Sequence, residues 1–292
     1  MSTKKAIILL TLTCIIWGTT FTVIKDITYK IDPFLLSSLR NWIASFVLFL
    51  YILIKNKKDA LKNQQSIKYG IILGVIIGAI YIIQTIGLKI TSSTHSAFIS
   101  SSGVIMVPII LFLFGKNKIE KNQLITVGIV MVGIYLLTNG NDNNPYNFGD
   151  TITLVGAIVC AINIILAGEY AKKTEQIIGL IFYQFLFAAV FSTIALVINQ
   201  LISGEKLVFE IEAIPSVLYL SLLGTLFCYF VMTWVQKYVS TLLTAMIYSL
   251  EPIFATTASI LYLHEKITYI EVIGGILIVS GVIFYTKKGE LN

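Results

Sequence analysis

The chain has 292 residues, of which 57% are hydrophobic and only 12% are charged. Soluble domains usually carry about 25% charged residues, so the composition argues against a soluble helical bundle. The net charge of +6 comes from short lysine clusters between apolar runs rather than from a basic stripe, which argues against nucleic acid as a partner.

Long apolar runs recur along the whole chain. About 20 apolar residues cross the membrane core as a helix, and helices satisfy their own backbone groups in lipid. The alternating segments of a membrane barrel are absent. The pattern predicts an all-α membrane protein with ten transmembrane helices. The expected spans are residues 6–24, 34–54, 69–89, 95–114, 122–138, 150–167, 177–201, 213–236, 242–263 and 267–286.

The start of the chain resembles a signal peptide, because Lys4 and Lys5 precede an apolar stretch. No clear small-residue cleavage site follows, so we expect an uncleaved first helix. With the N-terminus in the cytoplasm, the cytoplasmic segments hold 15 of the 21 lysine and arginine residues. This bias predicts an inner-membrane protein with both termini in the cytoplasm.

The two halves of the chain resemble each other at a constant offset of 148 residues. Lys118 matches Lys266, Gly133 matches Gly281 and Ser92 matches Ser240. The Asn- and Gly-rich linker 139–149 separates two expected repeats, 1–140 and 141–292, of five helices each. Because five is odd, the second repeat must enter the membrane from the opposite side. Such inverted repeats are typical of transporters, in which one half rocks against the other around a central site.

Several motifs extend this pattern over essentially the whole chain. They are WGTTF at 17–21, DPFLLSSLR at 32–40, GLKITSSTHSAFI at 87–99, SLEPIFA at 249–255, HEKIT at 264–268 and GGILIVSGV at 274–282. Together they resemble the EamA type of the drug/metabolite transporter superfamily. The resemblance implies export of amino acids or related compounds. Two departures, Asn117 opposite Glu265 and Val104 opposite Pro252, indicate that the halves are not chemically equivalent.

Glu251 is the most informative candidate residue, because an ionisable group inside a membrane span is costly unless it faces a cavity or a partner. It would bind an amino or cationic group of the substrate, or carry a coupling proton. The competing interpretation is that it satisfies backbone donors where Pro252 bends the helix. For Arg40 the favoured interpretation is snorkelling to the outer interface. The alternative partners are a substrate carboxylate and an acidic residue elsewhere in the chain.

Polar and aromatic side chains inside the other spans are candidates for lining a central cavity. Each of them could instead be a belt residue or a helix-to-helix hydrogen-bonding group. The expected substrate-binding residues are Trp17, Thr20, Tyr81, Gln84, Asn163, Tyr183, Tyr229, Tyr248 and Glu251. Close helix contacts are the favoured role of the serine run 100–102 and of the glycines, among them Gly74 and Gly128.

The three cysteines have no metal or disulfide spacing, and no nucleotide-binding or nucleophile motif is present. We therefore expect no enzyme, no cofactor and no metal. The leading hypothesis is a secondary transporter of a small metabolite, working as a monomer or homodimer and coupled to protons or to the substrate gradient alone. The alternatives are an efflux pump for toxic cations and a non-transporting membrane assembly factor or sensor.

Overall fold

The structure is a computed structural model that describes residues 1–114, 121–139, 146–204, 206–248, 250–264 and 266–289. The predicted repeat boundary at 140/141 and the compared residues Asn117 and Glu265 lie outside these ranges. Within them every regular element is a helix, and one isolated bridge pairs Ile31 with Phe209. The all-α prediction is therefore confirmed for the described residues.

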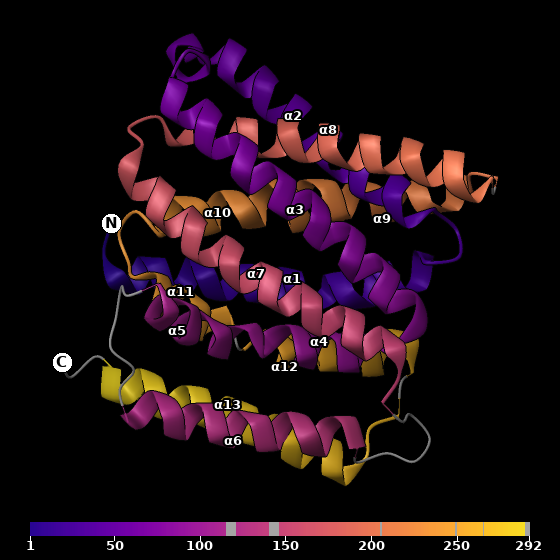
Figure 1. Ribbon diagram of the computed structural model, residues 1–292, viewed down its shortest axis with the longest axis vertical. Helices are drawn as coiled ribbons and strands as arrows, with labels where there is room; N and C mark the ends of the chain where they lie inside the picture. The colour runs from indigo at the N-terminus through magenta and orange to yellow at the C-terminus, as the bar shows by residue number, and fades with distance from the viewer. Residues whose placement is uncertain (115–120, 140–145, 205, 249, 265, 290–292) are drawn as a thin grey trace.

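The helices follow the order of the predicted spans (Figure 1). Their bounds are α1 Thr3–Ile27, α2 Pro33–Ile54, α3 Gln64–Ile90, α4 Ser93–Ser101, α5 Gly103–Leu113, α6 Lys121–Asn139, α7 Phe148–Lys173, α8 Ile177–Ser203, α9 Ile214–Tyr219, α10 Cys228–Val235, α11 Thr241–Tyr248, α12 Glu251–Ala258 and α13 Tyr269–Gly289. A π-helical segment, Leu220–Phe227, joins α9 to α10, and a second one, Ser259–Leu263, follows α12.

Seven segments of the described chain are long and apolar enough to cross a membrane. They are Thr3–Ile27, Pro33–Ile54, Gln64–Ile90, Ser93–Leu113, Phe148–Lys173, Ile177–Ser203 and Ile211–Val235. The chain is thus a multi-pass membrane protein by length and composition, and the count of ten spans stays a prediction.

Capping residues explain where several helices begin. Asp32 accepts hydrogen bonds from the backbone N–H groups of Phe34 and Leu35, and Pro33 supplies a preset first turn of α2. Asn63 caps α3 through the Ser66 N–H at 2.8 Å, so this helix begins at Gln64 rather than at the predicted residue 69. The apolar pattern alone could not indicate this polar first turn.

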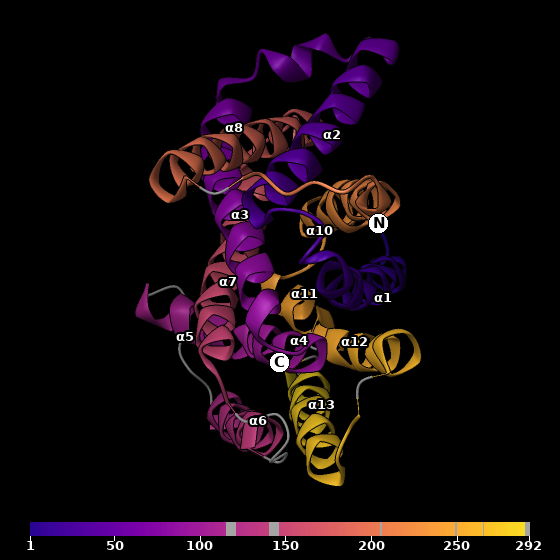
Figure 2. The same ribbon diagram turned by 90° about the vertical axis from the view of Figure 1, so that its right-hand side faces the viewer.

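The helices lie side by side across the long axis of the molecule (Figures 1 and 2). Helix α3 packs against α7 and α8, α2 packs against α8, and α6 and α13 form a pair at one extremity of the long axis. Close approach depends on glycine in the α3–α8 pair, since a Cβ at Gly74 would lie 2.7 Å from the carbonyl oxygen of Gln184. Gly128 is different, because no atom of the described residues lies within 4 Å of a Cβ built at Gly128. The predicted close helix contact of this glycine is therefore absent from the described part of the chain.

Two ends of the helix stack can be defined by their contacts. At the Lys25 end, the Lys25 ammonium donates to the carbonyls of Leu88 and Thr91 at 2.7 and 2.6 Å, and the Thr91 hydroxyl donates to Asp150. At the Lys62 end, the Ser66 hydroxyl donates to the Gln176 carbonyl at 3.1 Å. Helix α7 therefore begins where α1 and α3 end, and it ends where α3 begins.

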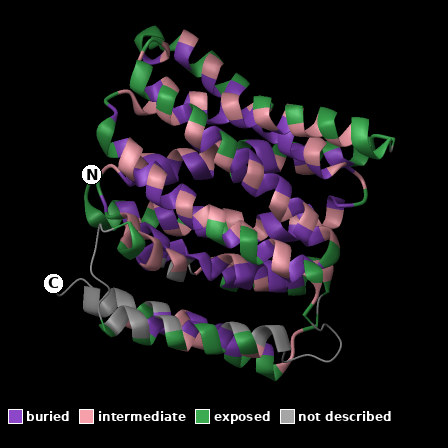
Figure 3. Cartoon of the chain, viewed as in Figure 1, coloured by how far each residue is buried: buried purple, intermediate pink, exposed green. Residues whose placement is uncertain are grey.

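Exposed positions recur along many of the helices (Figure 3). Many of the side chains at exposed positions are large and apolar. Phe46 is 60% exposed, and Leu201 and Ile202 are about 80% exposed on the last turns of α8. A soluble protein rarely leaves so much apolar area in contact with water. These faces match the hydrocarbon of a bilayer, while polar side chains such as Ser37, Asn41 and Thr85 are buried between helices.

Candidate functional site

A central cavity lies among α1, α2, α3, α4, α5, α7, α10, α11 and α12. Eight of the nine predicted binding residues line it: Trp17, Thr20, Tyr81, Gln84, Asn163, Tyr229, Tyr248 and Glu251. The cavity volume is about 80 Å³. A single water needs about 10–15 Å³ by this measure, so the cavity has room for several waters or a small solute.

Tyr183 is the predicted binding residue that the structure places elsewhere. Its hydroxyl donates to the carbonyl of Leu61 at 2.7 Å, and its Cβ packs where a Cβ at Gly70 would stand. The contact ties α8 to the segment before α3 at the Lys62 end. Sequence pattern alone could not separate it from the cavity tyrosines, because all of them lie in apolar runs.

A break between α11 and α12 brings Glu251 to the cavity. Pro252 has no N–H, and its ring would clash with the carbonyl of Tyr248 in a continuous helix, so α11 ends at Tyr248. Helix α12 then begins with Glu251. The partial positive charge of a helix N-terminus favours a negative side chain there. Pro252 therefore does bend the chain, as one interpretation of this motif predicts, and it leaves Glu251 facing the cavity.

A second break, between α4 and α5, faces the same cavity. Ser100, Ser101 and Gly103 line the cavity. The Ser101 hydroxyl donates to the Ala97 carbonyl and the Ser102 hydroxyl to the Ile99 carbonyl, which are the back-bonds that bend helices. Gly103 then lets α5 approach α7, since a Cβ there would lie 2.8 Å from the Ala157 carbonyl oxygen. The favoured packing role of the serine run is thus incomplete, because two of these serines also line the cavity.

Arg40 is buried with 1% of its surface exposed, so the favoured interpretation of snorkelling is wrong. Its Nε donates to the Thr225 hydroxyl at 3.1 Å, and its guanidinium carbon lies 3.8 Å from the centre of the Tyr81 ring. Its Nη1 is buried and has no hydrogen-bond partner in the described part of the chain. The guanidinium therefore brings an unused donor to a cavity that it lines.

Aromatic rings build one wall of the cavity around Trp17. The rings of Tyr229 and Tyr248 meet Trp17 edge-on, with centroids 5.1 and 4.9 Å away. The indole N–H donates to the Gly224 carbonyl at 2.8 Å, within the π-helical segment. Trp17 is thus fixed by packing and by one hydrogen bond, and it presents an apolar surface to the cavity.

Polar groups with spare hydrogen-bonding capacity complete the lining. Asn163 is 1% exposed, and its Nδ2 has no partner among the described residues. Within the same residues no ion pair joins Arg40 to Glu251. The cavity therefore combines one cationic side chain, one anionic side chain and the amides of Gln84 and Asn163 with apolar walls, as expected for a small amphipathic solute. No group of three or more His, Cys, Asp or Glu side chains in the described chain is arranged to hold a metal ion.

Comparison with known proteins adds a family. The model of the EamA-like transporter family matches residues 4–139 and, separately, residues 147–287. An uncharacterized transporter of Archaeoglobus fulgidus is 28% identical over 96% of this chain and 85% of its own length, and the uncharacterized transporter YoaV of Bacillus subtilis is 27% identical over 93% of each chain.

A probable amino-acid metabolite efflux pump of Escherichia coli is 20% identical over 96% of this chain and 94% of its own length. One crystal structure superposes with a TM-score of 0.70, covering 98% of this chain and 97% of that chain at 16% identity, which supports the fold alone.

Proposed function

The chain belongs to the EamA-like transporter family, and from this premise we propose that it moves a small zwitterionic metabolite, an amino acid or related compound, out of the cell by alternating access. Members of this family and the relatives above are transporters and not enzymes. The proposal places the protein in the cytoplasmic membrane with both termini in the cytoplasm, as the lysine distribution favours.

The proposal includes ten helices in two inverted repeats, 1–140 and 141–292. The two helix breaks support it. Ser102 and Leu250, which lie in the two breaks, are separated by the same 148 residues that relate the halves in sequence. Discontinuous helices at corresponding positions of two halves are the feature that marks the substrate site in inverted-repeat transporters. Both breaks line the one central cavity.

Helix packing supports the same arrangement. At the offset of 148 residues, α1 corresponds to α7, α2 to α8, α3 to the stretch from α9 to α10, and α6 to α13. The contact of α3 with α8 then corresponds to the contact of the π-helical segment with α2, and the contact of α3 with α7 corresponds to that of α10 with α1. The α6–α13 pair exchanges with itself. In addition, α7 begins at the Lys25 end, where α1 ends, so these counterparts run in opposite directions.

The single observation that carries the cargo proposal is the presence of Arg40 and Glu251 in one cavity without an ion pair between them. A charge in a low-dielectric site requires a partner. The carboxylate of an amino acid would pair with Arg40, and its ammonium group would pair with Glu251. The aromatic wall around Trp17 would receive the side chain.

Efflux of toxic cations is the alternative within transport. It needs only Glu251 as the binding anion, and Arg40 would repel such a cargo. A non-transporting assembly factor or sensor predicts no solute flux at all. The charge requirements of transport separate these possibilities.

The test is counterflow in proteoliposomes with leucine, leucine amide and N-acetylleucine, which carry both charges, only the positive charge and only the negative charge. A nucleoside and a cationic dye extend the panel. We expect exchange of leucine only, and a loss of about tenfold or more in Glu251→Gln and in Arg40→Gln. Glu212→Gln, at an exposed carboxylate, is the matched control and should keep wild-type flux.

Preference for leucine amide or the dye, lost in Glu251→Gln but retained in Arg40→Gln, would favour the cation pump instead. If no compound of the panel exchanges, the transport proposal loses its support.

A further inference from the structure

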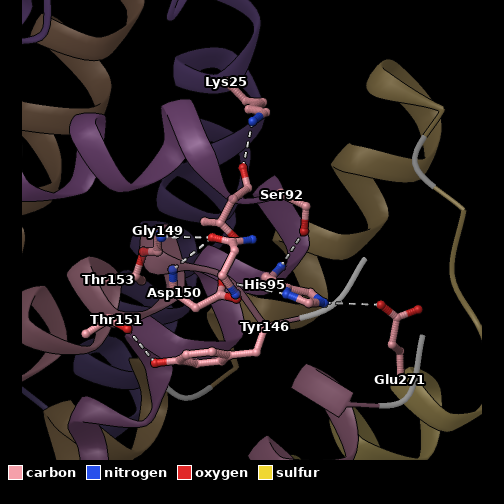
Figure 4. A network of polar contacts seen from close by, with 11 residues as sticks. Lys25, Ser92, His95, Tyr146, Gly149, Asp150, Thr151, Thr153 and Glu271 are labelled. Atoms are coloured by element: carbon pink, nitrogen blue, oxygen red, sulfur yellow. Dashed lines mark hydrogen bonds and ion pairs between the residues drawn. The ribbon is translucent and has the colours of Figure 1, made fainter. Parts of the chain in front are cut away.

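At the Lys25 end, His95 lies between two carboxylates from different helices (Figure 4). Its Nδ1 is 3.6 Å from Oδ1 of Asp150 in α7, and its Nε2 is 3.4 Å from Oε1 of Glu271 in α13. His95 and Asp150 are fully buried, and Glu271 is 3% exposed. Neither ring nitrogen has a hydrogen-bond partner in the described part of the chain.

Both carboxylates are held in place by the helix starts to which they belong. Oδ2 of Asp150 accepts the Asn147 N–H at 2.9 Å, which forms a capping box at the start of α7. Oε2 of Glu271 accepts the Thr268 N–H at 2.7 Å and its hydroxyl at 3.0 Å, which is the same device before α13. In each pair the remaining carboxylate oxygen is the one that faces His95.

The protonation chemistry of imidazole decides what this arrangement can do. A neutral imidazole donates from one ring nitrogen only, whereas an imidazolium donates from both. With a carboxylate opposite each nitrogen, only the imidazolium can bond Asp150 and Glu271 together. A neutral His95 leaves at least one buried carboxylate oxygen without a donor from the ring, and two negative charges remain near each other.

We propose that His95, Asp150 and Glu271 form a proton-binding site, separate from the central cavity, that latches the Lys25 end of the transporter closed. A proton from solvent adds to the free nitrogen of the neutral imidazole, and the charge of the three side chains changes from −2 to −1. The resulting imidazolium holds α4 to α7 and α13. Loss of the proton releases both carboxylates and lets this end open.

The charged groups around the latch are consistent with a single titrating histidine. Lys25 reaches it from α1 through the Thr91 carbonyl, and the Thr91 hydroxyl donates to Asp150. Lys89 lies in the last turn of α3. Glu251, at the first residue of α12, lies far from His95. The Thr22 hydroxyl is 3.2 Å from the hydroxyl of Ser259, just after the last residue of α12, and 3.5 Å from the hydroxyl of Ser93, at the start of α4. It is therefore the C-terminal end of α12 that lies beside the start of α4.

The latch shares two helices with the cavity, which gives it a mechanical connection to transport. Thr153 lines the cavity one turn after Asp150 in α7, and Ser100 lines it in α4, which also carries His95. Separation of α4 from α7 at the Lys25 end would therefore open the cavity toward that end. The latch rests on the proposed transport function, but it can be tested without a substrate.

The test uses Cys160, which lines the cavity, as a reporter of opening. Replacing Cys14 and Cys228, both fully buried, by alanine leaves Cys160 as the single thiol of the chain. Its reaction rate with N-ethylmaleimide is measured in proteoliposomes from about pH 5.5 to about pH 9, the range around which histidine changes charge. Dividing each rate by that of a His95→Lys or His95→Gln protein removes the thiol's own pH dependence.

The expected rate ratio of wild type to His95→Lys rises by roughly fivefold or more with pH, since a lysine keeps the positive charge. The ratio of wild type to His95→Gln should rise similarly, from well below one at low pH. Glu271→Gln should flatten the rise, and His264→Gln, at the second histidine of the chain, should leave it unchanged. If only one of the two reference proteins, His95→Lys or His95→Gln, folds, that protein serves as the reference. A rate ratio that stays constant with pH overturns the latch. That result would leave the counterflow assay of cargo unaffected.

Discussion

The guanidinium carbon of Arg40 lies 3.8 Å from the centre of the Tyr81 ring, and the Thr225 hydroxyl bonds both residues. The Tyr81 hydroxyl donates to Thr225 at 3.0 Å, while Arg40 Nε donates to it at 3.1 Å. A desolvated cation over an aromatic face is stabilised by about 2 kcal/mol. Tyr81 therefore holds Arg40 in the cavity rather than serving only as an apolar wall.

Replacing Tyr81 tests this positioning role. In Tyr81→Leu the cation loses its ring, and the apparent affinity for leucine in counterflow should fall by about tenfold, which matches a loss of ~1.4 kcal/mol. Tyr81→Phe keeps the ring and loses one hydrogen bond, so a change of less than about threefold is expected. Equal effects of the two substitutions would mean that the hydroxyl, and not the ring, positions Arg40.

Restoring a continuous helix at the second break should separate stability from transport. In Pro252→Ala the regained N–H favours a direct connection of α11 to α12, which would move Glu251 away from the cavity. We expect an unchanged or higher melting temperature together with a loss of most leucine exchange. Pro108→Ala, at a proline inside α5, is the control and should retain exchange. Full activity of Pro252→Ala would show that the break does not position Glu251.

The sequence contains most of the information needed to place the helices. Apolar runs predict the helical segments in order, but they do not divide the expected spans 95–114 and 242–263, in which the structure separates α4 from α5 and α11 from α12. A bend at Pro252 is one of the two interpretations that the sequence supports, whereas the favoured packing role of the serines 100–102 does not indicate the first break. Helix ends differ by a few residues where a polar cap such as Asn63 extends the first turn.

The partners of buried charges could not be predicted in the same way. Arg40 near the start of an apolar run fits both snorkelling and burial, and the choice depends on Thr225 and Tyr81, which are distant in sequence. The placement of His95 between Asp150 and Glu271, on which the proposed latch rests, could not be predicted for the same reason. Its readable signals are the capping patterns Asn147 to Asp150 and Thr268 to Glu271, but nothing in either pattern indicates that His95 lies between the two carboxylates.

Close helix approach at Gly74 should be required for stability. A Cβ at this position would lie 2.7 Å from the Gln184 carbonyl oxygen and 2.8 Å from the Ala188 nitrogen, both of which belong to the backbone of α8. Gly74→Ala should therefore cost about 1–3 kcal/mol, measured as a lower midpoint of unfolding in detergent. Gly128→Ala, which adds a methyl group to open space, should be neutral or slightly stabilising. A neutral Gly74→Ala would contradict the observed α3–α8 spacing.

Inversion of the two halves makes a prediction that single cysteines can test. In a chain without Cys14, Cys160 and Cys228, cysteines replace Lys62 and Lys206, which lie in the corresponding connections after the second helix of each half. If the halves are inverted, an impermeant maleimide added to intact cells should label Lys206→Cys, and should label Lys62→Cys only after the membrane is permeabilised. Tyr29→Cys should behave like Lys206→Cys, because the Glu210 N–H donates to the Lys30 carbonyl at 2.9 Å and so places the two connections at one end. Labelling of Lys62→Cys and Lys206→Cys from the same side would rule out the inverted arrangement. It would also remove the correspondence between the oppositely directed helices α1 and α7, on which the proposed alternating access depends.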